Sequence, residues 1–469
     1  MIMFNKSKFK EPMPVLPPEI RIKNFKEVEL GLDDNSALRE AERCLNCKNP
    51  PCVKGCPVGV KIPDFIKCIK DNDVNLAYKT ILKDNIFPAV CGRVCPQEKQ
   101  CEAKCVRNKS GEPVAIGSLE RYCADKNNEN EKLECILSNN PHKIAVVGSG
   151  PSGLTCASEL AGLGFEVTVF EALHTPGGVL AYGIPEFRLP RKVLIRELEN
   201  LKNKGVKILT NVVAGQSFSI DSLFEQGYSA VYISSGAGLP NFMNIPGEGM
   251  SGIYSANEFL TRVNLMHANK EEYDTPIPPV KKVAVIGAGN VAMDAARVAK
   301  RLGAEKVTVI YRRTENEMPA RKAEIIHAKE EGIEFLFLSN PKRFLGENGI
   351  VSKIECVKMK LEEKDSSGRN SVSVIPNSEF EVFADTVIIA IGNSPNSLIR
   401  NSEPELEFDS KGRIVTDLQT SQTSRKFVYA GGDAVTGAAT VIQAMGAGKK
   451  AAHQIFYDLN AENDLEVDR

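Results

Sequence analysis

The sequence predicts a mixed α/β protein, in which a helical, cysteine-rich N-terminal region precedes two units of parallel strands and helices. Three observations support this fold class. Eleven of the thirteen cysteines lie within the first 135 of the 469 residues. A glycine-rich turn at residues 148–153 and a second at 287–292 each follow a short apolar run and precede a helix-like run. The length fits two to four domains.

The overall composition excludes two functional classes. Lys and Arg number 59 and Asp and Glu 60, so the formal net charge is -1, whereas non-specific nucleic-acid binding needs a basic excess. The mean hydropathy is -0.20, and no apolar run approaches the ~20 residues that span a bilayer. Residues 1–10 are polar and basic without an apolar core behind them, so we expect no signal peptide and a cytoplasmic protein.

Two cysteine runs stand in the N-terminal region, where apolar spacing predicts helices over 35–44 and 63–69. The runs are CLNCKNPPCVKGCP at 44–57 and CGRVCPQEKQCEAKC at 91–105. Cytosolic proteins rarely keep structural disulfides, and zinc sites favour two Cys-x2-Cys pairs. Close cysteines followed by Cys-Pro are typical of iron–sulfur proteins, in which the Cys-Pro residue often binds the other cluster. One cluster is then expected on Cys44, Cys47 and Cys52, and a second on Cys56 with three ligands from the second run. A zinc or disulfide site is the alternative.

A dinucleotide fingerprint begins after the strand-like run at 142–147. Gly148, Gly150 and Gly153 have the G-x-G-x-x-G spacing, and a helix-like run and a second strand ending at Glu171 follow. The glycines allow a tight turn that brings backbone N–H groups to a pyrophosphate at the start of a helix. An acid about 20 residues further on is placed to accept hydrogen bonds from ribose hydroxyls. An accidental glycine-rich loop is the alternative.

A second fingerprint, after a loop at 273–280 that contains three prolines, begins with the strand-like run at 282–286. Gly287 and Gly289 open the variant GAGNVA, and the second strand of this unit ends at Arg312 and Arg313 in place of an acid. A carboxylate there would repel a 2′-phosphate, whereas an arginine fork binds it. The second site is therefore expected to bind NADPH, with a pair of surface arginines as the alternative.

The C-terminal part indicates a flavin site. The strand-like run at 426–430 ends at Gly432 and Asp433, and the N-terminus of the helix-like run that follows would stabilise negative charge on a reduced flavin ring. The strand-like run at 386–391, with Gly392 at the turn, is expected to mark the return of the chain to the first unit. From residue 143 onward the chain resembles two-dinucleotide-binding flavoproteins. Disulfide reductases of that fold need a cysteine pair beside the flavin, and only Cys156 stands in the corresponding helix.

The order of motifs is more specific. CLNCKNPPCVKGCP, CGRVCPQEKQCEAKC, GSGPSG, YGIPEFRLP, GAGNVAMD, YRRTENEMPA and AGGDAVTGAATV resemble the small (β) subunit family of NADPH-dependent glutamate synthase over almost the whole chain. The same module resembles the FAD/NADPH half of dihydropyrimidine dehydrogenase and the large subunit of NADH-dependent ferredoxin:NADP oxidoreductase. The resemblance implies FAD, NADPH and two [4Fe–4S] clusters. It implies a helical iron–sulfur domain at 1–140, a Rossmann-like FAD domain at 141–243 and 388–469, and an inserted Rossmann-like NADPH domain at 244–387.

The resemblance also implies site residues. Glu120, in GSLERY, is implied as the fourth ligand of the first cluster, with Cys91 as its competitor and a surface glutamate as the alternative. The ligands implied for the second cluster are Cys56, Cys95, Cys101 and Cys105. Those implied for FAD are Arg188, Gly432, Asp433, Ala439, Thr440 and Val441. Pro151, Ser152, Gly178 and Gly392 are also expected to bind a cofactor. Those implied for NADPH are Asn290, Val291 and Arg321.

The expected reaction is hydride transfer from NADPH to the flavin, followed by single-electron transfer through a cluster to a partner subunit. The glutaminase of the family uses an N-terminal cysteine, whereas this sequence begins Met1-Ile2-Met3 and has no second large domain. We therefore expect a hetero-oligomer with a glutamate synthase large subunit or a flavin/iron–sulfur small subunit. The alternatives are the large subunit of an electron-bifurcating transhydrogenase or sulfide dehydrogenase, a zinc-stabilised reductase and a non-enzymatic electron-relay scaffold.

Overall fold

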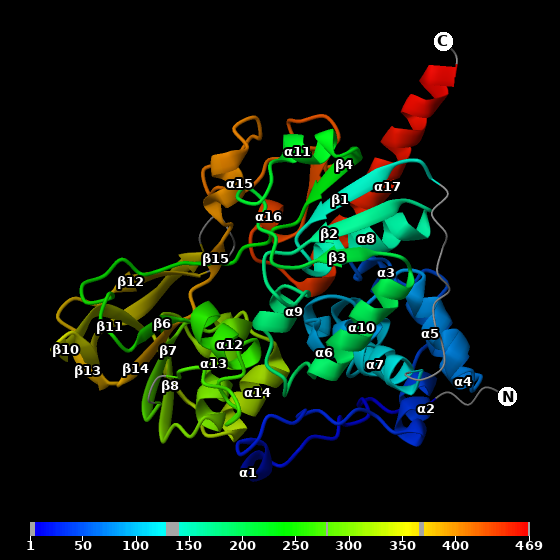
Figure 1. Cartoon of the computed structure of the whole chain (residues 1–469). Helices are drawn as coiled ribbons and strands as arrows, with labels where there is room; N and C mark the ends of the chain where they lie inside the picture. The colour runs from blue at the N-terminus through cyan, green and yellow to red at the C-terminus, as the bar shows by residue number, and fades with distance from the viewer. Residues whose placement is uncertain (1–4, 128–139, 278–279, 365–369, 468–469) are drawn as a thin grey trace.

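The computed structural model describes residues 5–127, 140–277, 280–364 and 370–467, with side chains as far as residue 461. A helical N-terminal part lies against two parts that each contain a parallel sheet (Figure 1). The expected fold class is therefore confirmed. Cys135 and the prolines at 278 and 279 lie outside the described residues.

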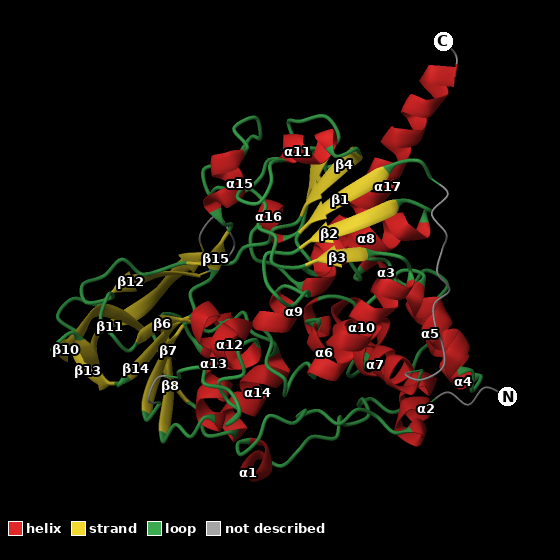
Figure 2. Ribbon diagram, viewed as in Figure 1, coloured by secondary structure: helices red, strands yellow, loops and turns green. Residues whose placement is uncertain are grey.

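The N-terminal part consists of helices and loops (Figure 2). Asp33 and Asp73 each cap a helix, because the carboxylate accepts a hydrogen bond from a backbone N–H group of the first turn. The helices are α1 (Pro18–Arg21), α2 (Asp34–Glu42), α3 (Pro51–Lys54), α4 (Ile62–Lys70), α5 (Val74–Leu82), α6 (Pro88–Val94), α7 (Ile116–Lys126) and the 3-10 turns η1 (Gln97–Lys99), η2 (Glu102–Lys104) and η3 (Val106–Lys109). Their core continues into the next part, since Phe65 and Phe87 share one hydrophobic cluster with Leu180 and Met445.

The second part contains a five-stranded parallel sheet in the order β16-β4-β1-β2-β3. Its strands are β1 (Lys143–Val147), β2 (Glu166–Phe170), β3 (Lys207–Leu209), β4 (Tyr228–Ile233) and β16 (Val428–Ala430). Its helices are α8 (Pro151–Gly162), α9 (Val179–Tyr182), α10 (Arg191–Asn203), α11 (Ile220–Glu225), α15 (Ser397–Ser402), α16 (Asp433–Thr436) and α17 (Val441–Val467). Val147 pairs with Phe170 on one side and Ile233 on the other, so three strands end together at one edge.

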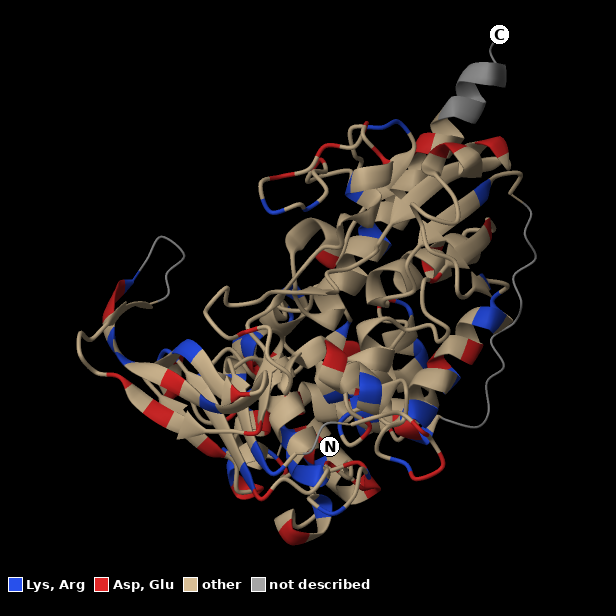
Figure 3. Cartoon of the chain, turned by 60° about the vertical axis from the view of Figure 1, so that its left-hand side comes forward, with Lys and Arg blue, Asp and Glu red and all other residues tan. Residues whose placement is uncertain are grey.

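The third part repeats this plan with the order β6-β14-β7-β8-β9. Its strands are β6 (Ile253–Ser255), β7 (Lys282–Ile286), β8 (Lys306–Tyr311), β9 (Glu334–Phe337) and β14 (Thr386–Ile389), and its helices are α12 (Ala256–Asn264), α13 (Asn290–Arg301), η4 (Glu315–Glu317) and α14 (Lys322–Glu330). An antiparallel sheet is built on it from β10 (Ser339–Glu347), β11 (Ile350–Lys364), β12 (Asn370–Val374) and β13 (Phe380–Phe383). Figure 3 shows both acidic and basic residues along this second sheet, where Arg343 pairs with Glu355 and Lys353 with Glu381.

The chain returns to the second part later than the sequence predicts. The run at 386–391 is expected to mark the return, but β14 pairs with β6 and β7 inside the nucleotide sheet. The expected boundary between residues 387 and 388 therefore falls within a strand of the third part. The two crossings lie side by side instead, as a short antiparallel pair of β5 (Leu239–Pro240) and β15 (Asn393–Ser394). Within the described residues, no helix is long and apolar enough to cross a membrane.

Candidate functional site

A cavity of about 1720 Å³ lies between the two parallel sheets and the N-terminal part. Residues 148–152 of the first glycine turn and 287–291 of the second both line it. Val94 and Pro96, which flank Cys95, line the same cavity. The two fingerprints and one cysteine run, which are far apart in the sequence, thus meet at one space.

The first glycine turn brings the start of α8 against β1. Gly148 has a φ of 98°, and a Cβ on Gly153 would lie 2.0 Å from the Gly148 carbonyl oxygen. Larger residues at these positions would push the helix N-terminus away from the strand. Glu171 lines the cavity, as expected, and its carboxylate accepts hydrogen bonds from the backbone N–H groups of Ser149 at 3.0 Å and Leu173 at 2.8 Å.

The second glycine turn has the same construction. Gly287 has a φ of 122°, and a Cβ there would lie 2.3 Å from the Ala390 carbonyl oxygen. Arg312 and Arg313 both line the cavity at the end of β8. Arg312 is exposed, while Arg313 is buried and donates through Nε to the Asn370 carbonyl oxygen at 2.7 Å. Two cationic side chains therefore follow the end of β8 on the wall of the cavity.

Residues from the C-terminal part of the chain also line the cavity. Asp433, Ala439, Thr440 and Val441 line the cavity, as do Gly178 and Gly392. Burial raises the pKa of Asp433, while the Ala439 N–H group, at 3.2 Å from the Asp433 carboxylate, opposes that rise.

Gly153 and Gly432 do not line the cavity but pack directly against residues that do. Gly432 has a φ of 67°, and a Cβ on it would lie 2.8 Å from the Ser152 Cβ. Its conformation and close packing therefore set the position of Ser152, which does line the cavity.

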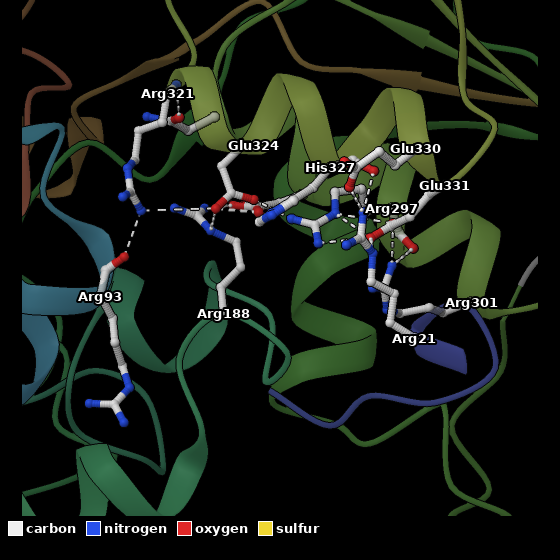
Figure 4. Close-up of polar contacts among 12 residues, drawn as sticks. Arg21, Arg93, Arg188, Arg297, Arg301, Arg321, Glu324, His327, Glu330 and Glu331 are labelled. Carbon is white, nitrogen blue, oxygen red and sulfur yellow. Dashed lines mark hydrogen bonds and ion pairs between the residues drawn. The ribbon is translucent and has the colours of Figure 1, made fainter. Parts of the chain in front are cut away.

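Two arginines that the resemblance implies as cofactor-binding residues have buried partners within the protein (Figure 4). Arg188 is expected at the flavin; it lines the cavity, but its guanidinium is held by Asp294 at 2.7 and 2.9 Å and by Glu324 at 3.1 Å. Arg321 is expected at NADPH, but it does not line the cavity, and its guanidinium donates to the Arg93 carbonyl oxygen at 2.6 Å. Buried carboxylates attract the first guanidinium, and the C-terminal end of α6 attracts the second.

A first group of thiols surrounds a small apolar hollow lined by Cys44, Cys47, Cys52 and Cys105. Burial, together with the neighbouring thiols of Cys44 and Cys105, raises the pKa of Cys52 to about 12. Thiols that raise one another's pKa by proximity are stabilised as thiolates when a soft cation binds them. The donor set therefore fits an iron–sulfur cluster.

A second group contains Cys56, Cys95, Cys101 and Glu120. Burial raises the pKa of Cys56 to about 11, with contributions from Glu120 and Cys95. Burial also raises the pKa of Glu120 to about 7, although its carboxylate accepts a hydrogen bond from Asn85 at 2.8 Å. Among the described side chains, no cation pairs with this carboxylate, and a carboxylate buried among thiols fits a metal ligand.

Cys91 lies beside the second group. Burial raises the pKa of Cys91, and Cys95 and Glu120 both raise it further. Its Sγ is 3.6 Å from the Asn85 amide oxygen and 3.5 Å from the Met445 sulfur. Cys91 therefore lies close enough to Cys95 to compete with Glu120 as a ligand in the second group.

Two candidate ligands are grouped differently from what the resemblance implies. Glu120 is implied beside Cys44, Cys47 and Cys52, and Cys105 beside Cys56, but the structure exchanges them. The turn η2 lies between Cys101 and Cys105, and these two residues face different groups. Among the described residues, no three His, Cys, Asp or Glu side chains converge as for a single metal ion.

The first turns of α17 connect the cavity with the second group. Gln100 donates through Nε2 to the Thr440 hydroxyl at 3.2 Å, and a Cβ on Gly446 would lie 3.0 Å from the Pro57 carbonyl oxygen. The sequence analysis did not identify the contact of Gln100 with Thr440 or that of Met445 with Cys91. It also did not identify Val94 and Pro96 as residues of the cavity wall. The Cys-Pro step at 95–96 is the signal that could have indicated the wall residues.

Two family models match the chain. Residues 21–132 match dihydropyrimidine dehydrogenase domain II, 4Fe-4S cluster, and residues 132–448 match pyridine nucleotide-disulphide oxidoreductase. The chain is 35% identical over 452 residues to the glutamate synthase [NADPH] small chain of Escherichia coli (strain K12), covering 94% of this chain and 96% of that one. It is 36% identical over 444 residues to the NADPH-Fe(3+) oxidoreductase subunit beta of Geobacter sulfurreducens, covering 88% of this chain and 64% of that one.

Solved structures show the same fold for the two sheet-containing parts. FprA of Mycobacterium tuberculosis in complex with NADPH is 21% identical, with a TM-score of 0.59 over 70% of this chain and 87% of that one. Thioredoxin reductase of T. acidophilum is 21% identical, with a TM-score of 0.50 over 67% of this chain and 97% of that one. At this identity the likeness establishes the architecture alone.

Proposed function

The chain belongs to the family of glutamate synthase [NADPH] small chains, and from this premise we propose that it passes electrons from NADPH through FAD and two [4Fe–4S] clusters to a partner subunit. The relatives and both matched domains make it an NADPH-dependent oxidoreductase with flavin and iron–sulfur cofactors. The number of clusters, their ligands and the partner are parts of the proposal.

One observation carries the proposal. A single cavity reaches both glycine turns and also the residues on either side of Cys95. A nucleotide at the turn at 287–291 and a flavin at the turn at 148–152 would therefore share one cavity. The flavin would also lie next to the wall that carries the second thiol group.

The protein's own groups bind and orient the cofactors. Backbone N–H groups at the starts of α8 and α13 are placed for two pyrophosphates, Glu171 for the ribose of FAD, and Arg312 and Arg313 for the 2′-phosphate of NADPH. The positive end of α17, beside Thr440, favours negative charge on the flavin ring. When bound, the flavin takes the electrons of a nicotinamide as a pair and gives them singly to an iron–sulfur centre.

We assign the cluster ligands by proximity. The first cluster takes Cys44, Cys47, Cys52 and Cys105, and the second takes Cys56, Cys95, Cys101 and Glu120. Cys91 stands beside Asn85 and Met445 as a packing residue. All twelve described cysteines are free thiols, which suits a reducing compartment, and we propose the cytoplasm.

The proposed partner is a second redox subunit, either a glutamate synthase large subunit or a flavin/iron–sulfur small subunit. Relatives are named as a small chain, a formate dehydrogenase subunit beta and an NADPH-Fe(3+) oxidoreductase subunit beta. Anaerobic copurification of the native complex tests this, because the subunit that accompanies the chain identifies the acceptor. A chain that purifies alone at its native concentration would contradict the proposal.

The electron path is tested by mixing the holoprotein with NADPH under anaerobic conditions. We expect loss of the flavin absorbance, followed by loss of the iron–sulfur absorbance. A flavin that NADPH does not reduce would favour the electron-relay scaffold. Iron and sulfide analysis separates the proposal from a zinc-stabilised reductase.

A further inference from the structure

Arg321 lies between the nucleotide turn and the second thiol group. It directly precedes α14 with φ -61° and ψ 139°. Its backbone N–H donates to the Asn290 side-chain oxygen at 2.9 Å. Asn290 is the first residue of α13 and lines the cavity. The backbone position of Arg321 is therefore tied to the turn that would hold the nucleotide.

The guanidinium of Arg321 extends in the other direction, into the N-terminal part (Figure 4). Nη1 donates to the Arg93 carbonyl oxygen at 2.6 Å, and Nη2 donates to the Gln97 side-chain oxygen at 3.3 Å. Arg93 stands in the last turn of α6, which Cys95 ends. Carbonyl groups at the end of a helix lack partners within the helix, and a cation there is favourable.

Residues next to Arg321 in the sequence also contact the N-terminal part of the chain. Lys99 donates through Nζ to the Pro319 carbonyl oxygen at 2.6 Å, and the backbone N–H of Lys322 donates to the Glu98 carboxylate at 3.1 Å. The stretch at 319–322 thus contacts the chain on both sides of the step from Cys95 to Pro96. A displacement of this stretch would be transmitted to Cys95.

Gln97, which accepts a hydrogen bond from Arg321, also packs against α7, the helix that contains Glu120. Its Nε2 donates to the Cys91 and Gly92 carbonyl oxygens, at 3.2 Å each. A Cβ on Gly117, in the first turn of α7, would lie 2.2 Å from that nitrogen. Gln97 therefore fills the space between α6 and α7, next to the turn that precedes Glu120.

We propose that Arg321 is a positioning residue that couples occupancy of the nucleotide turn to the reduction potential of the cluster at the second thiol group. The inference rests on the proposed function. A nucleotide that binds beside Asn290 shifts the backbone of Arg321 and so changes the distance between its guanidinium and the cluster. A nearby positive charge favours the more negative, reduced state of a cluster, so this distance contributes to the reduction potential.

The test is a redox titration of the anaerobic holoprotein, with and without NADP⁺, followed by the electron paramagnetic resonance signals of the reduced clusters. In the natural protein we expect NADP⁺ to shift the midpoint potential of one signal. Arg321→Gln is expected to move that midpoint to a more negative value and to lose the shift. Arg321→Lys keeps the charge and is expected to restore the midpoint. Arg343→Gln, which removes an exposed arginine of the same domain, is the matched control and is expected to change neither quantity.

Three outcomes would overturn the inference. The first is an unchanged midpoint and an unchanged NADP⁺ shift in Arg321→Gln with full iron and flavin content. The second is loss of iron from both Arg321 variants, which would mean that the residue only holds the fold together. The third is an NADP⁺ that does not perturb the flavin spectrum of the natural protein, which would contradict the proposed function itself.

Discussion

Single residues at the cavity show how charge is placed for recognition. Arg312 is exposed, and among the described residues its guanidinium has no hydrogen-bond partner that a ligand would have to displace. Arg313, in contrast, donates a hydrogen bond to the Asn370 carbonyl oxygen. Glu171 is fixed by two backbone N–H groups at the other turn. The first turn is therefore flanked by an anionic side chain and the second by cationic ones. In the proposed function this difference in charge would separate a ribose with free hydroxyls from one that carries a phosphate.

The first prediction concerns Arg312→Ala. Loss of a charge-assisted hydrogen bond costs about 1.5–3 kcal/mol, so the KM for NADPH is expected to rise roughly 10–100-fold, with kcat little changed. The KM for NADH is expected to change far less, and steady-state kinetics with both nucleotides measures the difference. An equal rise for both nucleotides would contradict a 2′-phosphate role.

The second prediction separates Glu120 from Cys91. Glu120→Ala is expected to lower the iron and sulfide content and to remove one cluster signal, because a buried ligand is lost. Cys91→Ser is expected to keep the full iron content, since this thiol contacts Asn85 and Met445. The reverse pattern would assign Cys91 as the ligand.

At the scale of elements, close packing between secondary structures fixes the cofactor turns. The helix α8 approaches the ends of β1 and β4 so closely that a Cβ on Gly153 would lie 2.0 Å from the Gly148 carbonyl oxygen and 2.5 Å from the Ser234 hydroxyl. The helix α17 packs against α8 as well, where a Cβ on Gly448 would lie 2.1 Å from the Ser152 carbonyl oxygen. The first glycine turn therefore depends on residues without a Cβ, which allow the helices and strands around it to approach closely.

The third prediction compares two glycines of α8. Gly153→Ala is expected to destabilise the protein by about 1–3 kcal/mol through overpacking and to weaken FAD binding. Gly162→Ala is the matched control: a Cβ there meets nothing within 4 Å, and alanine is the better helix former by about 1 kcal/mol. Thermal unfolding and flavin content measure both. Equal behaviour of the two variants would show that the turn tolerates a side chain.

At the scale of the whole molecule, a buried ionic network joins all three parts (Figure 4). Arg21 reaches from the N-terminal arm to Glu331 at 2.8 Å. Arg297 and Arg301 hold the same carboxylate, and both guanidinium groups lie over the ring of Phe187, with Cζ at 4.6 and 3.9 Å from the ring centre. Charges buried in this way favour one arrangement of the parts, since a displaced part would leave a charge without its partner.

The fourth prediction concerns Arg21→Ala. Removing one partner from a buried ionic group costs about 3 kcal/mol or more, so the unfolding temperature is expected to fall. We also expect the N-terminal and nucleotide-binding parts to unfold less cooperatively in calorimetry. The control is Lys23→Ala, two residues further on and exposed. An unchanged transition in Arg21→Ala would mean that the arm contributes nothing to domain docking.

The fifth prediction concerns acid stability. Burial by itself would raise the pKa of Glu331, but hydrogen bonding to Arg301 and the charge of Arg297 lower it to about 2. The folded protein therefore binds fewer protons here than the unfolded chain, in which this carboxyl has its ordinary pKa of 4.5. This contribution, on the order of 3 kcal/mol, is complete above the unfolded pKa and is lost as the pH falls toward 2.

Acid unfolding of Glu331→Gln measures that contribution. The variant is expected to be less stable at neutral pH and to lose stability less steeply below pH 4.5. Glu334→Gln, in an exposed pair with Lys306, is the control and is expected to follow the natural protein. A parallel acid profile for Glu331→Gln would contradict the depressed pKa.

The sequence by itself determined the features whose causes are local. A strand, a glycine turn, a helix and the next strand follow one another within about 30 residues in each unit. Residue spacing was therefore enough to place Gly148 and Gly287 in the two turns, and Glu171 and Arg312 directly after the second strand of each unit. The two cysteine runs likewise indicated iron–sulfur chemistry. The tertiary structure decided which distant segments meet: Cys105 with the first thiol group, Glu120 with the second, and Arg321 with α6 instead of the cavity. Such pairings depend on how helices pack across the whole chain, and buried carboxylates and helix ends redirect long side chains in ways that short-range spacing does not encode.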